Sequence, residues 1–387
     1  MESLFWVSAA VVLYVYAGYP LLLAAWTRLA TAPVRRRASS DAARRWPAIS
    51  IVVAARNEAK RLPSRVENLL DIPYPGRREI IVVSDGSTDN PAEALAPYDG
   101  RVRLIALPPG GKPSALNAGV AAATGEVLVF ADARQRFDRH ALVELVANFD
   151  DPAVGGVSGE LVLDCEREDA GGSSSIGEGV GLYWRYEKWL RRHESLVWST
   201  LGATGAIYAL RRELWRPLPA ETLLDDVLAP MRAVLAGKRV VFEEKARAFD
   251  QAPPDAAVES RRKTRTLAGN YQVLLLEPRL LLPMVNPVWL QYASHKVGRL
   301  TVPWALLAAF GSSAALAPES WIYAAALVLQ LAFYTLAAIG GLSASEEGRH
   351  RARVLGRQTR VAYTFVLMNV AAVAGLLALG RGRAVWR

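Results

Sequence analysis

The chain has 387 residues, a formal net charge of +9 and a hydrophobic content of 52%. This length allows one large domain or two ordinary ones, and the hydrophobic content is high for a soluble protein, so membrane segments are expected. The single cysteine, Cys165, excludes an intrachain disulfide and fits a reducing compartment, and four histidines without HxxH or HExxH spacing give no sign of a zinc site.

The first apolar segment covers residues 4–26 and contains no charged side chain. About 20 such residues are enough to cross the hydrocarbon core of a membrane, and no Lys or Arg precedes the segment as in a signal peptide. Six arginines follow between positions 28 and 45, so the positive-inside rule places this flank in the cytoplasm. We predict an N-terminal transmembrane helix over 1–27 and a basic linker over 28–47, which contacts anionic lipid or only sets the topology.

From position 48 to 270 the sequence alternates strand-like and helix-like segments, which predicts an α/β domain. Residues 49–53 and 80–83 are too apolar for half-exposed strands and are expected to be buried parallel strands. The segment between them has helical spacing of its apolar residues, so the three form a βαβ unit. Further strands are predicted at 102–107, 126–130, 154–163 (more exposed) and 240–243, and helices at 112–123, 139–149, 182–197, from 211–215 and at 227–236.

Polar side chains follow several of these strands directly. The segment 56–58 follows the first strand, 84–89 follows the second, and Asp132 follows the strand at 126–130 between two alanines. Because ligands of open α/β sheets bind at the carboxyl ends of the strands, these side chains are expected to meet at one polar site. A carboxylate such as Asp132 could hold Mg²⁺ or Mn²⁺ with diphosphate oxygens as further ligands, and Lys112 and Arg265 could contact the same phosphates.

Asp226 lies at the predicted start of a helix, next to Asp225. The helix dipole keeps a carboxylate ionised at that position. An ionised carboxylate at the edge of a ligand site is suited to act as a general base that takes a proton from an attacking hydroxyl. Taken alone, each acid is better explained as an ordinary turn or helix-start residue, and only the joint pattern favours a functional site.

Six pieces of the sequence, in this order, carry a family resemblance: VVAARNE (52–58), VVSDGSTD (82–89), GKPSALNAG (111–119), VLVFADA (127–133), GATGAIYALRRE (202–213) and LDDV (224–227). They resemble the membrane-bound glycosyltransferases of family 2, near the cellulose synthase and hyaluronan synthase group. The resemblance covers about 48–269 and the layout of the flanking membrane segments. It implies a Rossmann-like nucleotide-sugar-binding domain of the GT-A type, with a mixed sheet, flanked by transmembrane helices.

The resemblance also implies roles for individual residues. It implies that Asp226 is the catalytic base of a direct, inverting displacement, that Asp132 is the metal ligand, and that Asp85 contacts the nucleotide base. The remaining residues fall into two implied groups: the nucleotide-sugar site contains Ala54, Arg56, Asn57, Glu58, Lys112, Asn117 and Arg265, and the acceptor site contains Gly202, Thr204, Gly205 and Asp225.

The sequence departs from the family pattern in two places. The second aspartate of the metal-binding DxD motif is Arg134, so either Asp132 binds the ion alone or Arg134 supplies part of the charge neutralisation. The family's QxxRW motif falls on residues 262–266, where Arg265 is kept but Arg262 replaces the Gln and Thr266 replaces the Trp. In processive synthases that Trp stacks near the acceptor sugar, so its absence weakens the case for a long-chain polymerase.

The segment 271–300 is apolar but broken by three prolines, and it contains the basic side chains of Arg279, His295, Lys296 and Arg299. We predict amphipathic helices in the interface plane, with the basic groups toward the head groups. Uncharged runs at 301–317, 321–345 and 361–380 predict about three transmembrane helices within 301–387. Four spans in total would leave the arginine-containing tail outside, against the positive-inside rule.

The sequence therefore predicts an inverting glycosyltransferase that uses a nucleotide-diphosphate sugar, with Mg²⁺ or Mn²⁺, and a lipid-linked or polysaccharide acceptor. Its catalytic domain is expected at the cytoplasmic face of the inner (plasma) membrane, in contact with membrane lipid and not with nucleic acid. The resemblance leaves room for accessory subunits of a polysaccharide export system. The alternative, motivated by the altered motifs, is a catalytically impaired glycosyltransferase-like membrane subunit that scaffolds a partner enzyme.

Overall fold

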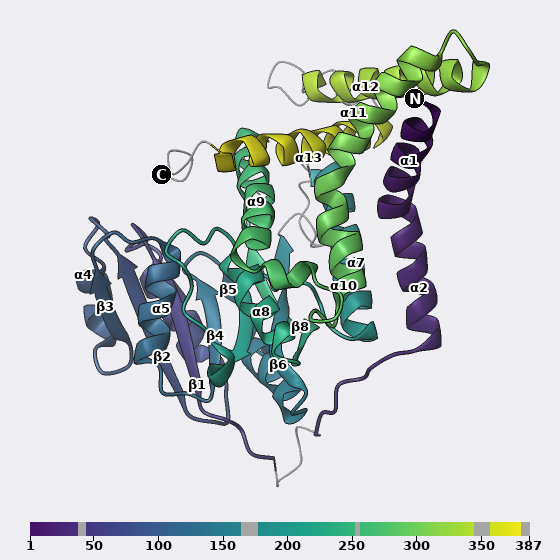
Figure 1. The fold of residues 1–387 in the computed structure, drawn as a ribbon. Coiled ribbons are helices and arrows are strands. Elements are labelled where there is room, and N and C mark those ends of the chain that lie inside the picture. The colour runs from purple at the N-terminus through teal and green to yellow at the C-terminus, as the bar shows by residue number, and fades with distance from the viewer. Residues whose placement is uncertain (38–43, 164–176, 252–255, 344–356, 381–387) are drawn as a thin grey trace.

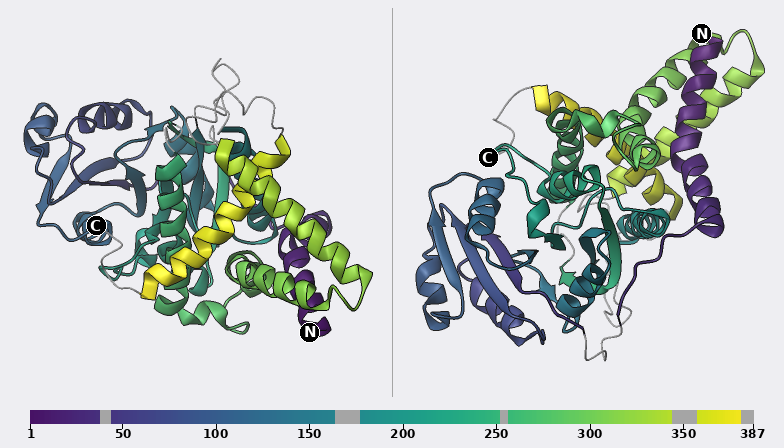
Figure 2. Two further views of the ribbon diagram at one scale, coloured as in Figure 1. Left: turned by 90° about the horizontal axis from the view of Figure 1, so that it is seen from above. Right: turned by 60° about the horizontal axis from the view of Figure 1, so that its bottom comes forward.

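A computed structural model describes residues 1–37, 44–163, 177–251, 256–343 and 357–380; Cys165 lies outside them. These residues form an α/β domain with a group of long helices on one side (Figure 1). In both views of Figure 2 the N-terminal helix lies beside the C-terminal helices, away from the β3 edge of the sheet. The α/β fold class predicted from the sequence is confirmed.

Eight strands of the described residues form one mixed sheet, in the order β3-β2-β1-β4-β7-β6-β8-β5. Strands β3, β2, β1 and β4 run parallel, β7 is antiparallel to β4 and to β6, and β8 is parallel to β6. The carboxyl ends of β1, β2, β4 and β8 therefore share one edge of the sheet with the start of β7. The bounds are β1 Ile49–Ala55, β2 Arg78–Asp85, β3 Arg103–Leu107, β4 Val127–Asp132, β5 Arg136–Phe137, β6 Val154–Leu163, β7 Ile207–Arg211 and β8 Arg239–Asp250.

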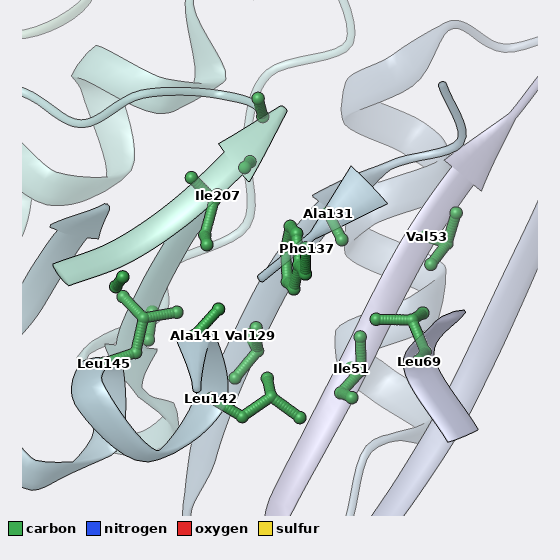
Figure 3. Close-up of a cluster of buried hydrophobic side chains, with 14 of the residues drawn as sticks. Ile51, Val53, Leu69, Val129, Ala131, Phe137, Ala141, Leu142, Leu145 and Ile207 are labelled. Atoms are coloured by element: carbon green, nitrogen blue, oxygen red, sulfur yellow. The ribbon is translucent and has the colours of Figure 1, made fainter. Parts of the chain in front are cut away.

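Helices cover both faces of the sheet, because side chains of a strand alternate between faces. Ile51 and Val53 of β1 face a core with Leu69 and Leu142 (Figure 3), whereas Val52 between them belongs to the core on the opposite face. Helices α3 and α6 contribute to the first core, and α5 and α8 to the second. The helices of the domain are α3 Leu62–Asp71, α4 Pro91–Leu95, α5 Lys112–Ala122, α6 Ala141–Ala147, α7 Gly177–Val197, α8 Asp225–Leu235 and α9 Ala256–Leu276.

Three predicted elements differ from the structure. The glycine-rich segment before position 211 ends in strand β7, and the helix expected from 211–215 is only a short 3₁₀ turn, Arg212–Leu214. Strand β8 continues to Asp250, well past the predicted end at 243. Strand β6 is almost entirely buried, because it lies between β7 and β8 and not near the edge of the sheet.

Three helices are long and apolar enough to cross a membrane among the residues that the structure describes: Glu2–Leu29, Trp321–Leu342 and Gln358–Gly380. The first combines α1 Glu2–Leu13, a π-helical turn Tyr14–Gly18 and α2 Tyr19–Leu29. The others belong to α12 Trp321–Ser343 and α13 Arg357–Gly380. The predicted span at 301–317 lies in α11, Gly298–Leu316, which is not among the three. Proline, glycine and serine residues within α11 reduce its hydropathy.

The segment 271–300 does not form separate helices in one plane. Helix α9 continues to Leu276, through the domain end predicted at 270, and a 3₁₀ turn Pro278–Leu281, α10 Trp289–Gln291 and a π-helical turn Tyr292–Val297 then lead into α11. His295 was expected to face lipid head groups, but only 3% of it is exposed and it contacts Glu194 of α7. The prediction was wrong for His295 because the polar partners of this segment lie inside the protein.

The N-terminal helix packs on the α/β domain as well as on the C-terminal helices. Tyr19 and Leu23 of α2 are buried against Leu190 and Val197 of α7. The Tyr19 hydroxyl donates a hydrogen bond of 2.8 Å to Oε1 of the fully buried Glu194. The lower part of this helix is therefore tied to the domain by a hydrogen bond to a buried carboxylate.

Helix α9 joins the domain to α13. Leu267 of α9 is buried against Ala371 and Ala372 of α13. At Gly375 of α13 an added Cβ would lie 2.7 Å from the backbone nitrogen of Ala268, so the two helices approach as closely as a glycine allows. The middle of α9 therefore packs directly on an apolar helix, while the turn before it lies at the cavity.

Candidate active site

A cavity of about 500 Å³ opens at the carboxyl edge of the sheet, beside the ends of β4 and β6, the loop before β7 and the start of α8. The mixed topology explains this meeting point: β7 runs antiparallel to β4, so the loop that precedes β7 lies where β4 ends. The ionisable lining comprises four carboxylates, seven cationic side chains and one histidine: Asp132, Glu194, Asp225 and Asp226; Lys112, Arg134, Arg191, Arg262, Lys263, Arg265 and Lys296; and His295.

Lys112 lies at the centre of the acidic side of this cavity. Its Nζ is 3.0 Å from Oδ1 of Asp132 and 3.4 Å from Oδ2 of Asp225. Burial favours the neutral amine, but the nearby carboxylates of Asp132, Asp225 and Asp226 outweigh it and raise the pKa of Lys112. The ammonium therefore stays charged and joins the end of β4 to the start of α8.

Asp226 lies on the same side of the cavity, and the loop before β7 packs against it. Its Oδ2 accepts a hydrogen bond of 3.0 Å from the backbone N–H of Gly205. A Cβ added at Gly205 would lie 2.9 Å from this oxygen, so only glycine allows the loop to approach so closely. Burial, followed by the charge of Asp225, raises the pKa of Asp226 to about 6, which suits a carboxylate that accepts a proton near neutral pH.

The predicted acceptor residues lie together with Asp226. Gly202, Thr204, Gly205 and Asp225 all line the cavity. Thr204 is buried, and its hydroxyl accepts a hydrogen bond of 2.7 Å from Nη1 of Arg191. The backbone of the loop is further held by a hydrogen bond from the Ala203 N–H to the carbonyl of Asp226. The loop and the acid therefore form one hydrogen-bonded unit.

Asp85 lies at the end of β2, separated from Asp132 by β1, which corresponds to about 10 Å across two strand spacings. Its carboxylate is buried and accepts hydrogen bonds of 2.6 and 3.0 Å from the N–H groups of Gly110 and Gly111. Gly111 has a φ of +87°, a conformation that favours glycine, and it directly precedes Lys112. The hydrogen bonds to Asp85 therefore hold the turn that precedes Lys112 and so position Lys112 at the cavity.

The predicted residues after β1 include Asn57, which forms hydrogen bonds with the loop after β2. Asn57 has a φ of 55°, and its Oδ1 accepts a hydrogen bond of 2.9 Å from the Thr88 N–H. Arg56 is largely exposed, with its Nη1 3.9 Å from Asp85, and Glu58 pairs with Arg61. Ala54 contributes to the core of the sheet face that α5 covers. These four residues lie at the same sheet edge but do not line the 500 Å³ cavity.

Asn117 is placed differently from the sequence prediction. Its side chain donates a hydrogen bond of 2.8 Å to the Leu218 carbonyl and accepts one of 2.9 Å from the Leu218 N–H. It is not among the residues that line the cavity. Asn117 therefore fastens the segment around position 218 to α5, and its predicted contact with the donor stays a prediction.

Several residues of the cavity were not predicted as site residues. Arg191 comes from α7, Lys296 from the π-helical turn before α11, and Glu194 lies one helical turn after Arg191. Burial lowers the pKa of Lys296, and the charge of Arg191 lowers it further. The interleaved basic and aromatic residues of α7 were a signal in the sequence, but nothing local shows that Lys296 faces the same cavity.

The implied divalent metal does not fit the donor set of this chain. Arg134 replaces the second acidic ligand, and its Nη2 instead pairs with Asp250, the last residue of β8, at 2.8 Å. Asp132 and Asp225 already share the Lys112 ammonium. Across the described ranges there is no group of three or more His, Cys, Asp or Glu side chains that could hold a metal ion.

A second, smaller cavity of about 130 Å³ adjoins the first on the side of the long helices. Tyr16 of the N-terminal helix and Met368 and Asn369 of α13 contribute to its lining, together with Leu267 and Leu300. Seven residues line both cavities: Trp184, Arg191, Lys263, Thr266, Asn270, His295 and Lys296. The cavity at the edge of the sheet therefore adjoins a cavity among the apolar helices, because the same seven residues line both.

Part of this chain is similar to known proteins. The family model for glycosyl transferase family 2 matches residues 50–216. The probable glycosyltransferase YdaM of Bacillus subtilis (strain 168) is 26% identical over 243 residues, which are 59% of this chain and 56% of the relative. The poly-beta-1,6-N-acetyl-D-glucosamine synthase of Staphylococcus aureus (strain COL) is 23% identical over 237 residues, 59% of this chain and 55% of that synthase. The chain spans about half the length of the curated relatives it matches.

One solved structure is similar over almost the whole chain. The mannosyltransferase PcManGT from Pyrobaculum calidifontis, in complex with GDP-Man and Mn²⁺, has a TM-score of 0.70 and 22% sequence identity, and the match covers 97% of this chain and 98% of that one. At this identity the likeness shows a shared fold. Residues 50–216 are therefore similar to glycosyl transferase family 2, and the described residues form a GT-A-like mixed sheet with three long apolar helices.

Proposed function

We propose that this glycosyltransferase passes a sugar from a nucleoside-diphosphate sugar to a hydroxyl group of a lipid-linked acceptor, with inversion at the anomeric carbon. The observation that carries the proposal is that Asp226 and Lys112 line the same cavity and lie near enough for the carboxylate to raise the pKa of the ammonium. A carboxylate that accepts a proton near neutral pH thus lies close to a fixed positive charge. An inverting displacement needs both, one for the attacking hydroxyl and one for the departing diphosphate.

In the proposed reaction the acceptor hydroxyl transfers its proton to Asp226. The hydroxyl oxygen forms a bond to the anomeric carbon while the bond from that carbon to the diphosphate oxygen breaks, and the electron pair leaves with the diphosphate. The Gly205 N–H orients Oδ2 of Asp226. Because the attack is direct, one base is sufficient and no second carboxylate is needed as a nucleophile.

The acceptor is proposed to be lipid-linked because the catalytic cavity shares seven lining residues with the cavity among the long helices. A lipid chain could enter from the apolar side, past Leu267, Leu300 and Met368, while its polar head reaches Asp226. A soluble polysaccharide acceptor has no need of this second space. A single addition also agrees with Thr266 at the position where processive synthases carry a Trp.

The catalytic domain is proposed to lie at the cytoplasmic face of the plasma membrane. The arginines that follow the first apolar helix support this orientation. Three crossings, in place of the four expected from the sequence, would also bring the arginine-containing tail to the cytoplasmic side. Accessory subunits of an export system stay a prediction from the resemblance.

The test is a transfer assay with purified protein in nanodiscs, using a nucleotide-sugar panel that includes UDP-N-acetylglucosamine and GDP-mannose. We expect transfer of the radiolabelled sugar to a lipid-extractable product. Asp226→Asn should keep donor binding, measured by thermal shift, and lose transfer by about 100-fold or more, since it removes the base but keeps a hydrogen-bond acceptor for Gly205.

Asp99→Asn is the matched control. Asp99 lies in an exposed turn and does not line the cavity, so donor binding and transfer should equal those of wild type. Equal transfer by wild type and Asp226→Asn would contradict the assigned base. Label that appears only in a water-soluble polymer would contradict the lipid acceptor and favour chain extension. Donor binding without transfer by any of the proteins would favour the scaffolding subunit.

A further inference from the structure

Resting on the proposed function, we propose that this enzyme neutralises its departing diphosphate with its own side-chain cations, with Lys112 at the centre, in place of a divalent metal ion. The inference starts from the disagreement between the family's metal requirement and the donor set of this chain. It concerns the residues that the structure brings together at the end of β4.

The position two residues after Asp132 shows the disagreement most directly. A metal site of this kind needs hard oxygen donors, and Arg134 supplies a cation at that position. Arg134 lies about half exposed at the cavity wall, and its partner Asp250 is buried. Gln135 donates a second hydrogen bond of 2.8 Å to the same carboxylate oxygen. Asp250 is therefore taken up by two neighbours and is not left as a replacement ligand.

The position of Lys112 is the second observation. Its ammonium lies between Asp132 and Asp225, where an ion bound by the acids of this cavity would have to lie. Asp225 Oδ2 is buried and accepts no hydrogen bond from the described residues, and the Lys112 ammonium pairs with it at 3.4 Å. Displacing Lys112 would therefore leave Asp225 without compensation, and a second cation placed beside it would be repelled.

The charge balance of the cavity is the third observation. Seven cationic side chains face four carboxylates, an excess of three positive charges with His295 neutral. The diphosphate of the donor is negative and gains a further negative charge when its bond to the anomeric carbon breaks. Fixed ammonium and guanidinium groups can stabilise that charge without a metal, and Arg adds a planar fork that matches phosphate oxygens.

The first test uses the unmodified protein in nanodiscs with UDP and GDP as probes and UDP-N-acetylglucosamine and GDP-mannose as donors. Nucleotide binding by calorimetry and sugar transfer are measured in excess EDTA and again with added Mn²⁺ or Mg²⁺. We expect both to change by less than about twofold, whereas a metal-dependent transferase should lose about 100-fold or more on chelation.

The second test uses substitutions with opposite expectations. Lys112→Met should lower transfer by about 100-fold, with no recovery on adding Mn²⁺, and Lys112→Arg should recover part of the rate because the charge is kept. Arg134→Asp restores the missing carboxylate and should create a bound-Mn²⁺ signal by electron paramagnetic resonance. Arg136→Asp, two residues on and also exposed, is the matched control and should give no such signal.

The results separate the two proposals. If EDTA abolishes nucleotide binding and transfer in wild type and Mn²⁺ restores both, the fixed-cation inference is overturned and the proposed transfer reaction stands. If no nucleotide or nucleotide sugar binds under either condition, the proposed function itself fails and this inference fails with it. Unchanged binding and transfer in EDTA, with loss in Lys112→Met, establish that the chain's own cations do this work.

Discussion

Asp225 and Asp226 are neighbours in the sequence, but their carboxylates have different surroundings. Asp225 is buried and faces Lys112, whereas Asp226 is partly accessible from the cavity and accepts a hydrogen bond from Gly205. Burial and the adjacent charge raise the pKa of Asp226 to about 6. We therefore propose different roles for the two acids: Asp225 binds the Lys112 ammonium, and Asp226 exchanges a proton with the acceptor.

This arrangement predicts the pH dependence of transfer. A base with a raised pKa of about 6 is ionised above that pH and protonated below it, so kcat/KM should be level above about pH 7 and fall about tenfold per unit below pH 6. The measurement is a pH profile of the wild-type enzyme between pH 5 and 8.5, with protein stability checked at each pH.

The same profile in Asp225→Asn identifies the group that titrates. Removing the neighbouring negative charge should lower the pKa of Asp226, so the acidic limb should move to lower pH whatever the absolute rate becomes. A limb that stays in place in this variant would show that a different group controls the rate.

At the scale of single residues, the sequence predicted one site containing Asp85, Asp132 and Asp226, with Lys112 at the same phosphates. The structure brings Asp132, Lys112 and Asp226 together, whereas Asp85 does not line the cavity. The prediction works because each residue follows or begins an element whose direction the sequence pattern reveals. It misses Arg191 and Lys296, which come from helices packed onto the sheet edge. Whether these two side chains face the cavity depends on how their helices pack against the sheet, and the local sequence does not predict that packing.

At the scale of elements, the loop of residues 202–205 connects the sheet to Asp226, the proposed base. Gly205→Ala adds a Cβ that would lie 2.9 Å from Oδ2 of Asp226, so the carboxylate or the loop must shift. A displacement of about 1 Å at a reacting group can cost about 100-fold in rate. We expect kcat to fall between about 10- and 100-fold, with donor binding unchanged, in steady-state assays over a range of donor concentrations.

Gly311→Ala in α11 is the matched control, since nothing lies within 4 Å of the added Cβ. It should keep the wild-type rate and melting temperature. A Gly205→Ala enzyme with full activity would show that the contact between loop and base is not needed for transfer.

The strands of the parallel half were predictable because β1, β2 and β4 are short apolar runs buried on both faces. In the other half, β6 was predicted at its observed position, but β7 was not predicted and β8 was predicted too short. Residues 202–206 are small and glycine-rich, which locally favours a loop, but Ile207–Arg211 pairs with β4 on one side and β6 on the other. In β8 the exposed Lys245 and Arg247 alternate with the buried Ala246 and Ala248, because that strand lies near the edge of the sheet.

At the scale of the whole molecule, the N-terminal helix belongs both to the membrane part and to the catalytic domain. Its 28 residues correspond to about 42 Å, more than the roughly 30 Å hydrocarbon core requires. The part of the helix beyond the length needed for the hydrocarbon core includes Tyr19 and Leu23, which pack against α7. Hydropathy alone predicted this helix but could not show that its lower half is part of the domain.

Tyr19→Phe tests this docking. It removes the hydroxyl that donates to the buried Glu194, whose other oxygen has no hydrogen-bond partner, so the expected loss of stability is about 1.5–3 kcal/mol. Tyr14→Phe is the matched comparison: it removes a neutral hydrogen bond to Ser294 and should cost about 0.5–1.5 kcal/mol. Thermal unfolding in nanodiscs measures both, and equal losses would contradict the special role of Glu194.

Helix α9 contributes Arg265 and Thr266 to the catalytic cavity, and within the next two residues it packs on α13. A rigid helix that touches both regions transmits any tilt of α13 to the cavity wall. Helix tilt responds to the thickness of the surrounding bilayer through hydrophobic mismatch. We therefore expect the acyl-chain length of the host lipids to change the rate of transfer, through the close contact between α9 and α13.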